Sequence, residues 1–494
     1  MAHRHHRHHD RFHPRSATRS RVEPLLPRRL SGSYDAAATT PDNRQHWVYA
    51  DSLDALAAGS PEVRRVLRNR TRYEVMNNCY AAGICLTLAE SLVGIGPRLQ
   101  MTGWSAARNR EVEDAWEAWA KEINLAAKLR ALRMARAVDG EAFAMFVTRP
   151  TGRVRLDLRL IEGDQVASPL TLRYDPAAVD GLEYGPDGLP SGYYVLRHHP
   201  GAAGFYGSYD EADLVPSRYM IHWFRATRPG QARGIPELAP ALPLFAQLRR
   251  YTLAELGAAE NAASISLVMK TTLVDGAAAK VPYMEEMELP RGTAIFPPEG
   301  WEPYQPKAEH PVTSYQDFKR EVLSEIARVL CMPYLVAALT SRDINYAGGR
   351  LDMQAWYRAI AVEQTDMAIV VLDRIFVEWL REMQMTTEAL DIKHQWFWRG
   401  LEHVDPAKES TAQDRHLRNY STTLAAEYAA RGLDWETELR QAKRERDRLR
   451  KYRLIPAENL APAPVDDGDA DEEDDGDTGE EDTSARRARV RIAQ

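Results

Sequence analysis

The stretch TSYQDFKREVLSEIARVLCMPYLVAALTSRDINYAGGR, residues 313–350, places a helical pattern directly before a polar loop. Its apolar residues recur at the spacing of one helical face: Phe318, Val322, Ile326 and Val329. Cys331-Met332-Pro333 ends the pattern, because proline cannot continue a helix. A second helical pattern, residues 351–383, follows the glycine-bearing loop. Two helices that bracket a polar loop indicate a displayed element on a rigid frame, which favours a binding or mechanical role over catalysis.

Another long helix is predicted before this stretch, over residues 239–269. It carries an apolar stripe: Leu242, Phe245, Leu248, Leu253 and Leu256. Residues 270–312 contain seven prolines and are predicted to form turns and short strands. On the far side, residues 405–455 are predicted to be helical and become strongly charged toward their end.

The N-terminal part of the ordered chain combines helices with a small sheet. Ser60-Pro61-Glu62 has the N-cap and first-turn residues of a helix, which we expect to reach Leu92. A second helix is expected from Ala106 to Val138, with four apolar residues on its buried face: Trp116, Trp119, Ile123 and Leu129. Residues 140–224 show short apolar runs between turns, which predicts a small mixed or antiparallel sheet. The predicted fold class is therefore α+β, mostly helical.

Charge divides the chain into a body and two tails of opposite sign. Residues 1–30 carry eight Arg against two acidic residues, and residues 465–494 carry twelve acidic residues against four Arg. Both tails have the composition of disordered segments, and for the His-rich start we favour a flexible basic arm over a metal-binding tract. The mildly acidic body is poorly suited to tight wrapping of duplex DNA. Three cysteines without paired spacing indicate reduced thiols. Neither a secretory signal nor a membrane span is expected.

No motif for nucleotide, metal or cofactor chemistry is present. The sequence lacks a phosphate-binding loop, a nucleophile elbow, a zinc-binding helix motif and a calcium loop. His198, His199 and His222 are interpreted as structural, and Gly94-Ile95-Gly96 as a helix stop. The strongest enzymatic alternative is a metal-dependent nuclease or recombinase that uses the carboxylates of the 351–383 helix. Its candidate residues are Asp352, Glu363, Asp366 and Asp373. A third alternative is a scaffold or adaptor with disordered tails.

An ordered series of short motifs resembles the lambda-type phage portal protein family. The series begins with Arg70, Asn77-Asn78, Tyr80-Ala81, Gly94 and Gly96, and continues with Asp139-Gly140-Glu141, Ile161-Glu162-Gly163-Asp164, Val215-Pro216, Ile221-His222-Trp223-Phe224 and Arg228-Pro229-Gly230-Gln231-Ala232-Arg233-Gly234-Ile235-Pro236. It ends with Ile326-Ala327, Pro333-Tyr334, Asn345-Tyr346, Arg350 and Val404-Asp405-Pro406. Each motif is weak alone, but the ordered set over residues 45–455 is specific. The sequence departs from the family at Ala347-Gly348-Gly349, where small hydroxylated residues are usual.

The resemblance implies a non-enzymatic subunit of a dodecameric ring around a DNA channel, at one vertex of a phage or prophage capsid. The implied divisions are a disordered arm (1–45), a wing (46–238), a first stem helix (239–269), a clip (270–312), a second stem helix (313–332), a tunnel loop (338–350), a long wing helix with a following strand (351–400), a crown-like helical region (401–456) and an acidic tail (457–494).

The resemblance also implies partners and DNA-facing residues. The partners would be twelve copies of the chain itself, double-stranded DNA held without sequence specificity, the terminase large subunit, the major capsid protein and scaffold, and a head–tail adaptor. Assembly would occur in the bacterial cytoplasm, with no membrane, metal or cofactor involved. The tunnel loop would present Ser341, Arg342, Asp343, Asn345, Tyr346, Gly348, Gly349 and Arg350. Lys319, Arg320 and Arg328 would line the channel along the stem.

Overall fold

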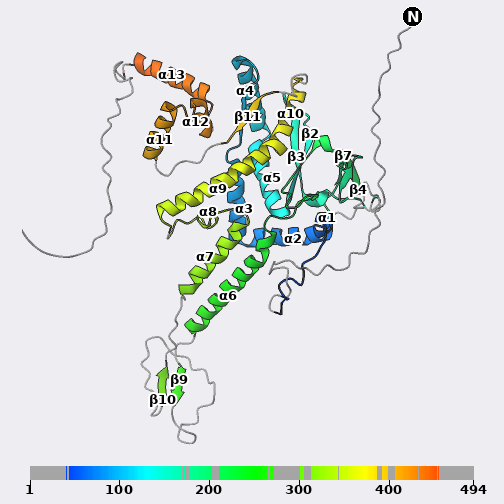
Figure 1. The fold of residues 1–494 in the computed structure, drawn as a ribbon, viewed down its shortest axis with the longest axis vertical. Coiled ribbons are helices and arrows are strands. Elements are labelled where there is room, and N and C mark those ends of the chain that lie inside the picture. Colours follow the sequence, from blue (N-terminus) through cyan, green and yellow to red (C-terminus); the bar gives the residue numbers. More distant parts are fainter. Residues whose placement is uncertain are drawn as a thin grey trace, which may run out of the picture.

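The computed structural model describes most of the chain between residues 40 and 454. The described residues are 40–41, 44–169, 172, 178–202, 211–264, 268–271, 301–304, 313–342, 344–385, 392–398, 406–431, 433–452 and 454. The predicted N-terminal arm, most of the predicted clip, Asp343 and the acidic tail therefore lie outside the described residues. Within them the protein is α+β, as predicted, and helices dominate (Figure 1).

The helix expected from Ser60 to Leu92 is two helices, so its predicted continuity was wrong. After the short α1 (Ala55–Ala58), α2 spans Pro61–Asn77 and α3 spans Cys79–Val93. Ser60 caps α2 by accepting a hydrogen bond from the Val63 amide. Between the two helices Asn78 adopts an extended conformation, and its side chain accepts from the amides of Tyr80 and Ala81. The chain turns here because this asparagine caps a new helix.

The second predicted helix is also divided, at Ile123 and Asn124. α4 spans Ala106–Glu122 and α5 spans Leu125–Asp139, and Asn124 between them is left-handed with φ 53°. Asparagine tolerates this conformation better than most residues. The four apolar residues predicted to be buried on this stretch are all buried.

Every strand pair in the described part of the chain is antiparallel. β2 (Glu141–Thr148) lies between β3 (Leu156–Ile161) and β8 (Met220–Phe224). A second sheet has the order β4-β5-β6-β7, formed by Ala178–Val179, Leu182–Tyr184, Pro190–Leu196 and Ala212–Pro216. β1 (Arg98–Met101) pairs with β11 (His394–Phe397), and β9 (Val268–Thr271) pairs with β10 (Trp301–Tyr304). The single-turn 3-10 segments are Gly163–Gln165, Ser217–Tyr219 and Ala239–Ala241.

The long helix predicted over residues 351–383 starts five residues earlier and contains a π-helical segment. α9 spans Tyr346–Met367, the π segment Ala368–Leu372, and α10 Asp373–Glu382. This helix crosses the body and supplies much of the core: Trp356, Ile360, Met367, Val371, Leu372, Ile375, Phe376 and Trp379. The Trp379 ring meets the Trp116 ring edge-on, with centroids 5.5 Å apart. The core is therefore built between α4 and the end of the long helix.

Two further groups of helices extend from the body (Figure 1). α6 (Leu242–Ser264) runs outward toward β9, and α7 (Thr313–Arg328) returns from β10 beside it. We call this pair the two-helix arm. A short α8 (Tyr334–Ala337) connects α7 toward α9. On the opposite side of the body lie α11 (Pro406–Arg418), α12 (Leu424–Ala430) and α13 (Trp435–Lys451).

Candidate functional site

The two-helix arm is well packed only where it joins the body. Near the body, Phe245 and Leu248 of α6 and Val322 and Ile326 of α7 are buried. Farther out the two helices contact each other through aromatic rings. The centres of the Tyr251 and Phe318 rings are 4.4 Å apart. Beyond that point the predicted apolar stripe of α6 faces solvent.

Leu253 and Leu256, the outer members of that stripe, are 61% and 54% exposed. We expected them to pack like Leu242, Phe245 and Leu248, which are buried. The difference arises because the arm is only two helices thick and α7 covers one side of α6. Two exposed leucines, one helical turn apart, form an apolar surface that the single chain does not cover.

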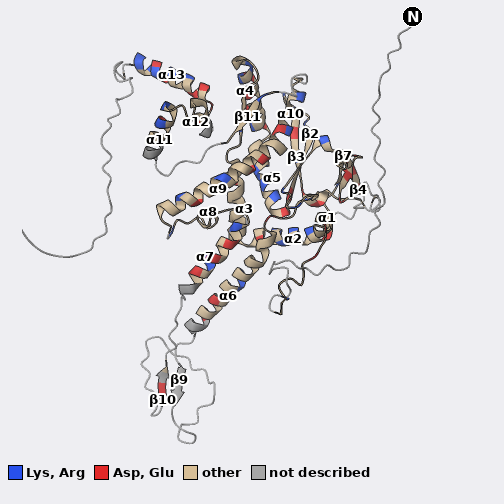
Figure 2. Ribbon diagram, in the orientation of Figure 1, with Lys and Arg blue, Asp and Glu red and all other residues tan. Residues whose placement is uncertain are grey.

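The three basic residues predicted along the arm have different environments. Lys319 places its ammonium 5.1 Å from the centre of the Tyr80 ring, and the Arg320 guanidinium lies 5.5 Å from that of Tyr334. Burial alone would lower the pKa of Lys319, but its hydrogen bond to Tyr80 and its electrostatic interactions with Tyr80 and Tyr315 raise it overall. Arg328 is exposed. Two of the three cations thus contact aromatic rings of the same chain, and the mixed charges of the arm appear in Figure 2.

Residues 338–350 are not a loop throughout, which corrects the predicted boundary. Residues 338–345 form the connection, and α9 begins at Tyr346. Asn345 caps it, since its side-chain oxygen accepts a hydrogen bond of 2.6 Å from the Gly348 amide. Tyr346, Gly348, Gly349 and Arg350 therefore lie in the first turn of a helix. The strong cap offsets the low helix propensity of two glycines.

The two glycines allow a close approach to the residues before the helix. A Cβ at Gly348 would lie 2.9 Å from the side-chain oxygen of Asn345, and one at Gly349 would lie 3.2 Å from Cγ2 of Ile344. Both glycines lie where a larger residue would crowd the cap of α9.

The residues from Ser341 to Arg350 place positive charge near the N-terminus of α9. Arg342 and Arg350 are both exposed, and so are Ser341 and Tyr346. The N-terminus of α9 adds the partial positive charge of its helix dipole at the same place. Backbone amides in a first helical turn point toward an approaching anion. The arrangement suits contact with phosphate groups.

Three of the four carboxylates considered for a metal site are held by other side chains. Glu363 accepts a hydrogen bond of 2.8 Å from Arg133 and also pairs with Arg225. Asp366 accepts 3.0 Å and 2.8 Å bonds from Arg136 and the Trp223 indole. Paired arginines neutralise these carboxylates, which is the opposite of what a divalent cation site needs.

The other two candidate carboxylates, Asp373 and Asp352, lie apart from Glu363 and Asp366. Asp373 accepts bonds of 3.1 Å and 2.7 Å from His394 and the Trp396 indole. Its pKa is lowered overall, because these bonds outweigh the effect of burial. Asp352 is exposed. The structure therefore gives three of these four carboxylates side-chain partners. The sequence could not reveal those of Glu363 and Asp366, because they lie more than a hundred residues earlier in the chain.

Arg133 and Glu237 form the centre of the first buried charge network. Arg133 is fully buried and donates to Glu237 at 2.8 Å. Arg136 donates to the other oxygen of Glu237 at 3.0 Å, and stacks 4.4 Å from the Trp223 ring. Burial alone would raise the pKa of Glu237, but the surrounding arginine charges hold it below its usual value. This network joins α5, the linker before α6, and α9.

A second buried network joins the motifs that carry the family resemblance. Glu141, fully buried, accepts bonds of 2.6 and 2.8 Å from Arg233, 3.1 Å from His222 and 3.0 Å from the Gly234 amide. These contacts hold the pKa of Glu141 well below its usual value although burial opposes them. His222 is structural, as predicted, because burial lowers its pKa and its ring stacks on Phe143 at 4.3 Å.

Glycines in these motifs allow the segments to meet. Gly140 has φ 90°, and a Cβ there would lie 2.2 Å from the Ile235 carbonyl carbon. A Cβ at Gly234 would lie 2.1 Å from the Gly140 carbonyl oxygen. Residues about ninety positions apart therefore touch backbone to backbone, which only glycine permits. The motifs Asp139-Gly140-Glu141 and Arg233-Gly234 thus act as one structural unit.

One group of His and acidic residues in the described chain has the spacing of metal ligands: Glu162, Asp164 and His199. Arg72 donates to Asp164 at 2.7 Å and lies 3.3 Å from Glu162. The Arg72 guanidinium thus supplies the positive charge that a metal ion would otherwise bring to these carboxylates. The three cysteines of the chain, Cys79, Cys85 and Cys331, are free thiols, as predicted.

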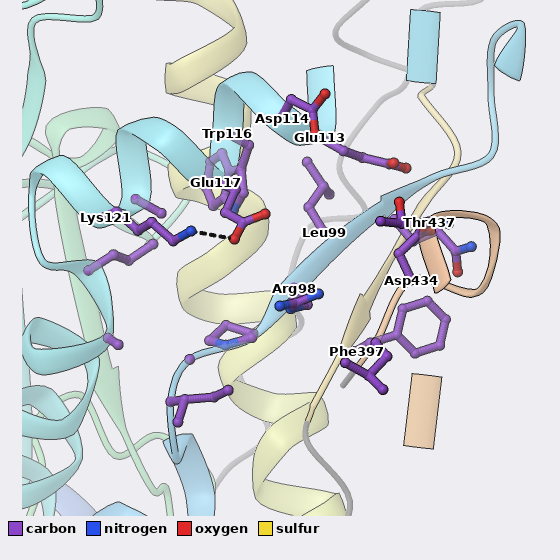
Figure 3. Close-up of a pocket in the computed structure, with 18 of the residues that line it drawn as sticks. Arg98, Leu99, Glu113, Asp114, Trp116, Glu117, Lys121, Phe397, Asp434 and Thr437 are labelled. Carbon is purple, nitrogen blue, oxygen red and sulfur yellow. Dashed lines mark hydrogen bonds and ion pairs between the residues drawn. The ribbon is translucent and has the colours of Figure 1, made fainter. Parts of the chain in front are cut away.

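A cavity of about 540 Å3 lies between the body and the C-terminal helices (Figure 3). Arg98 and Glu113 line it from the body, while Asp434 and Thr437 line it from the start of α13. Burial and the nearby acidic residues Asp434, Asp114 and Glu436 raise the pKa of Glu113 to about 7, against a hydrogen bond from the Met101 amide. Sequence reasoning missed this cavity, since it forms between segments more than three hundred residues apart.

Comparison with known proteins identifies the family. The family described as phage portal protein, lambda family, matches residues 45–364 of this chain, which is more than half of its length. The chain belongs to the lambda family of phage portal proteins. The resemblance seen in the short motifs is thereby confirmed.

The comparisons also find similarity to one phage protein and to chains of gene transfer agent particles. A protein of Halomonas phage phiHAP-1 named "Probable portal protein" is 23% identical over 467 residues, which is 84% of this chain and 85% of that protein. A chain from the neck of an empty gene transfer agent particle aligns with TM-score 0.46 at 14% identity, and covers 76% of this chain and 94% of its own length. A chain from a native gene transfer agent virion aligns with TM-score 0.45 at 14% identity, over 80% of this chain and 99% of its own. None of the described helices of this portal protein is long and apolar enough to cross a membrane.

Proposed function

We propose that this portal protein forms a dodecameric ring at one capsid vertex and is the channel through which DNA is packaged and ejected. The observation that carries the proposal is the two-helix arm, which projects from the body with Leu253 and Leu256 uncovered. A ring supplies a neighbour for every such arm. A heterologous contact between two different faces closes into a ring when the rotation is right.

In this proposal the stem, clip, wing and crown of the subunit correspond to separate regions of the fold. The two-helix arm is the stem, and the segment between its helices, which contains β9 and β10, is the clip. The body with α2–α5 and its sheets is the wing, crossed by the long helix α9–α10. The helices α11–α13 are the crown. The clip would contact the terminase large subunit during packaging and a head–tail adaptor afterwards, whereas the wing would contact the major capsid protein and scaffold during assembly in the bacterial cytoplasm.

DNA would pass the segment from Ser341 to Arg350. Its exposed Arg342 and Arg350, beside the N-terminus of α9, offer a few positive charges that do not read sequence. A sliding duplex requires weak contacts, and a small number of phosphate contacts gives modest, salt-sensitive affinity. The channel role requires no catalytic group. The nuclease alternative is disfavoured because arginines already pair with Glu363 and Asp366.

Replacement of the two arginines tests the DNA-facing role. The variant carrying Arg342→Ala and Arg350→Ala should assemble normally but retain less packaged DNA, measured as nuclease-protected DNA per particle. Arg197→Ala, an exposed arginine on the second sheet that pairs with Asp213, is the matched control and should package normally. Normal DNA retention by the double variant would reject contact of this segment with DNA.

A further inference from the structure

The helix α13 carries a dense basic face that the rest of the described chain leaves uncovered. Residues 440–451 contain seven Lys or Arg and two acidic residues. At 100° per residue, one face collects Arg440, Lys443, Arg444, Arg448 and Lys451 together with Glu436 and Asp447, so that five basic residues outnumber two acidic ones. No residue of α13 is buried, and the ribbon of α13 in Figure 2 is blue, for Lys and Arg, at its far end. The opposite face carries the apolar residues Trp435, Leu439 and Leu449.

Of these five cations, Arg440 alone has a carboxylate partner within the described part of the chain. Arg440 lies 4.0 Å from Glu436, at the limit of an ion pair. Lys443, Arg444, Arg448 and Lys451 pair with no carboxylate in the part of the chain that the structure describes. Like charges three and four residues apart on a helix destabilise it slightly, so a negatively charged partner would be favourable here.

The chain itself contains a complementary segment a short distance away. Residues 466–482 contain twelve acidic residues and no Lys or Arg. Residues 452–465, fourteen in number, connect them to α13. Such a connection can span up to roughly 50 Å, whereas residues 440–451 of the helix extend over only about 18 Å. A short tether gives an effective concentration on the order of millimolar, enough to make weak ionic contacts persistent.

We propose that the acidic segment 466–482 binds the basic face of α13 in the same chain and screens that face from DNA. Phosphates of duplex DNA would otherwise compete for the same cations. The contact is electrostatic, so it weakens as salt shortens the screening length. This inference stands apart from the ring and from the DNA-facing segment, because it requires only the composition and placement of α13 and of the acidic segment.

Cross-linking of the full chain tests the contact directly. A zero-length carbodiimide reagent should join Lys443 or Lys451 to acidic residues of 466–482 at low salt, and the products should disappear at high salt. Lys319 on the two-helix arm is the internal control and should give no such product. A mixture of nitrogen-15 and unlabelled protein should give these products within single chains. Absence of the products, or products only between chains, would overturn the proposal.

DNA binding tests the screening. In the full chain, the twelve acidic residues are replaced by their amides, and binding of a short duplex DNA is measured at low salt. The affinity should rise at least roughly tenfold, because several phosphate contacts become available. The same replacement should give no gain in a chain that also carries the face changes Lys443→Ala, Arg444→Ala, Arg448→Ala and Lys451→Ala. An equal gain in both backgrounds would mean general charge repulsion and would overturn the proposal, as would no gain in either.

Discussion

The body and the two-helix arm differ in whether their side chains find partners within the chain. In the body even charged residues are buried, because Arg133, Glu141 and Arg233 each have carboxylate or guanidinium partners at hydrogen-bond distance. In the arm, apolar residues such as Leu253 and Leu256 remain in solvent. The buried charges of the body are thus paired within one chain, whereas the exposed leucines of the arm would be covered by other copies in the proposed ring.

Breaking the buried network should have the largest effect. Glu141→Ala leaves the buried Arg233 guanidinium without its carboxylate and should destabilise the protein by about 3–5 kcal/mol. Urea unfolding followed by tryptophan fluorescence measures this loss. The control is Arg197→Ala, which removes a surface pair with Asp213 and should leave the unfolding midpoint unchanged. Equal losses from both variants would show that the body does not depend on its buried charges.

Two glycine substitutions test how closely the backbone segments of the body approach each other. Gly234→Ala places a methyl group against the Gly140 carbonyl and should cost at least about 2 kcal/mol. Gly83→Ala in α3 meets no atom within 4 Å and should stabilise the protein by about 0.5–1 kcal/mol. Thermal unfolding of the two variants gives shifts of opposite sign if the motif contact is as close as described. An unchanged unfolding temperature for Gly234→Ala would contradict this close contact.

The smallest expected effect lies where the body meets the C-terminal helices. The folded protein raises the pKa of Glu113 from its usual 4.5 to about 7. The folded state therefore holds this proton more tightly, and stability falls as the pH rises from 4.5 to 7. Glu113→Gln keeps the acceptor for the Met101 amide and should stabilise the protein at pH 8 by roughly 1 kcal/mol after solvent screening.

At pH 4.5 the benefit of Glu113→Gln should disappear, which thermal unfolding at the two pH values checks. Glu117→Gln on the same helix, which removes the ion pair with Lys121, is the control without this gain. If Glu113→Gln increased stability equally at both pH values, the protonation of Glu113 would not affect the stability of the region where the body meets α13.

Local patterns in the sequence predicted much of the fold, and long-range contacts explain what they missed. Caps and apolar spacing identified the start of α2 at Pro61, the buried face of α4 and the inner part of the buried face of α7, since these depend on neighbours within a few residues. Phe318, the outer member of the face predicted on α7, is exposed. The breaks at Asn78 and Asn124 were missed because an asparagine is compatible with both a helix interior and a turn.

The candidate site shows the same limit. Exposure of Arg342 and Arg350 agrees with a polar displayed segment, but the start of α9 at Tyr346 depends on the cap from Asn345. The environments of Glu363 and Asp366 depend on Arg133 and Arg136, which lie 230 residues earlier in the chain. No local pattern could show that these carboxylates were already paired.

The particle mass of the purified protein, measured by mass photometry, tests the central claim most directly. The account predicts particles with the mass of twelve subunits for the unmodified chain. The variant carrying Leu253→Asp and Leu256→Asp should fold equally well but fail to form them, because its arm no longer presents an apolar surface. A monomer or dimer of the unmodified chain under all conditions would contradict the account.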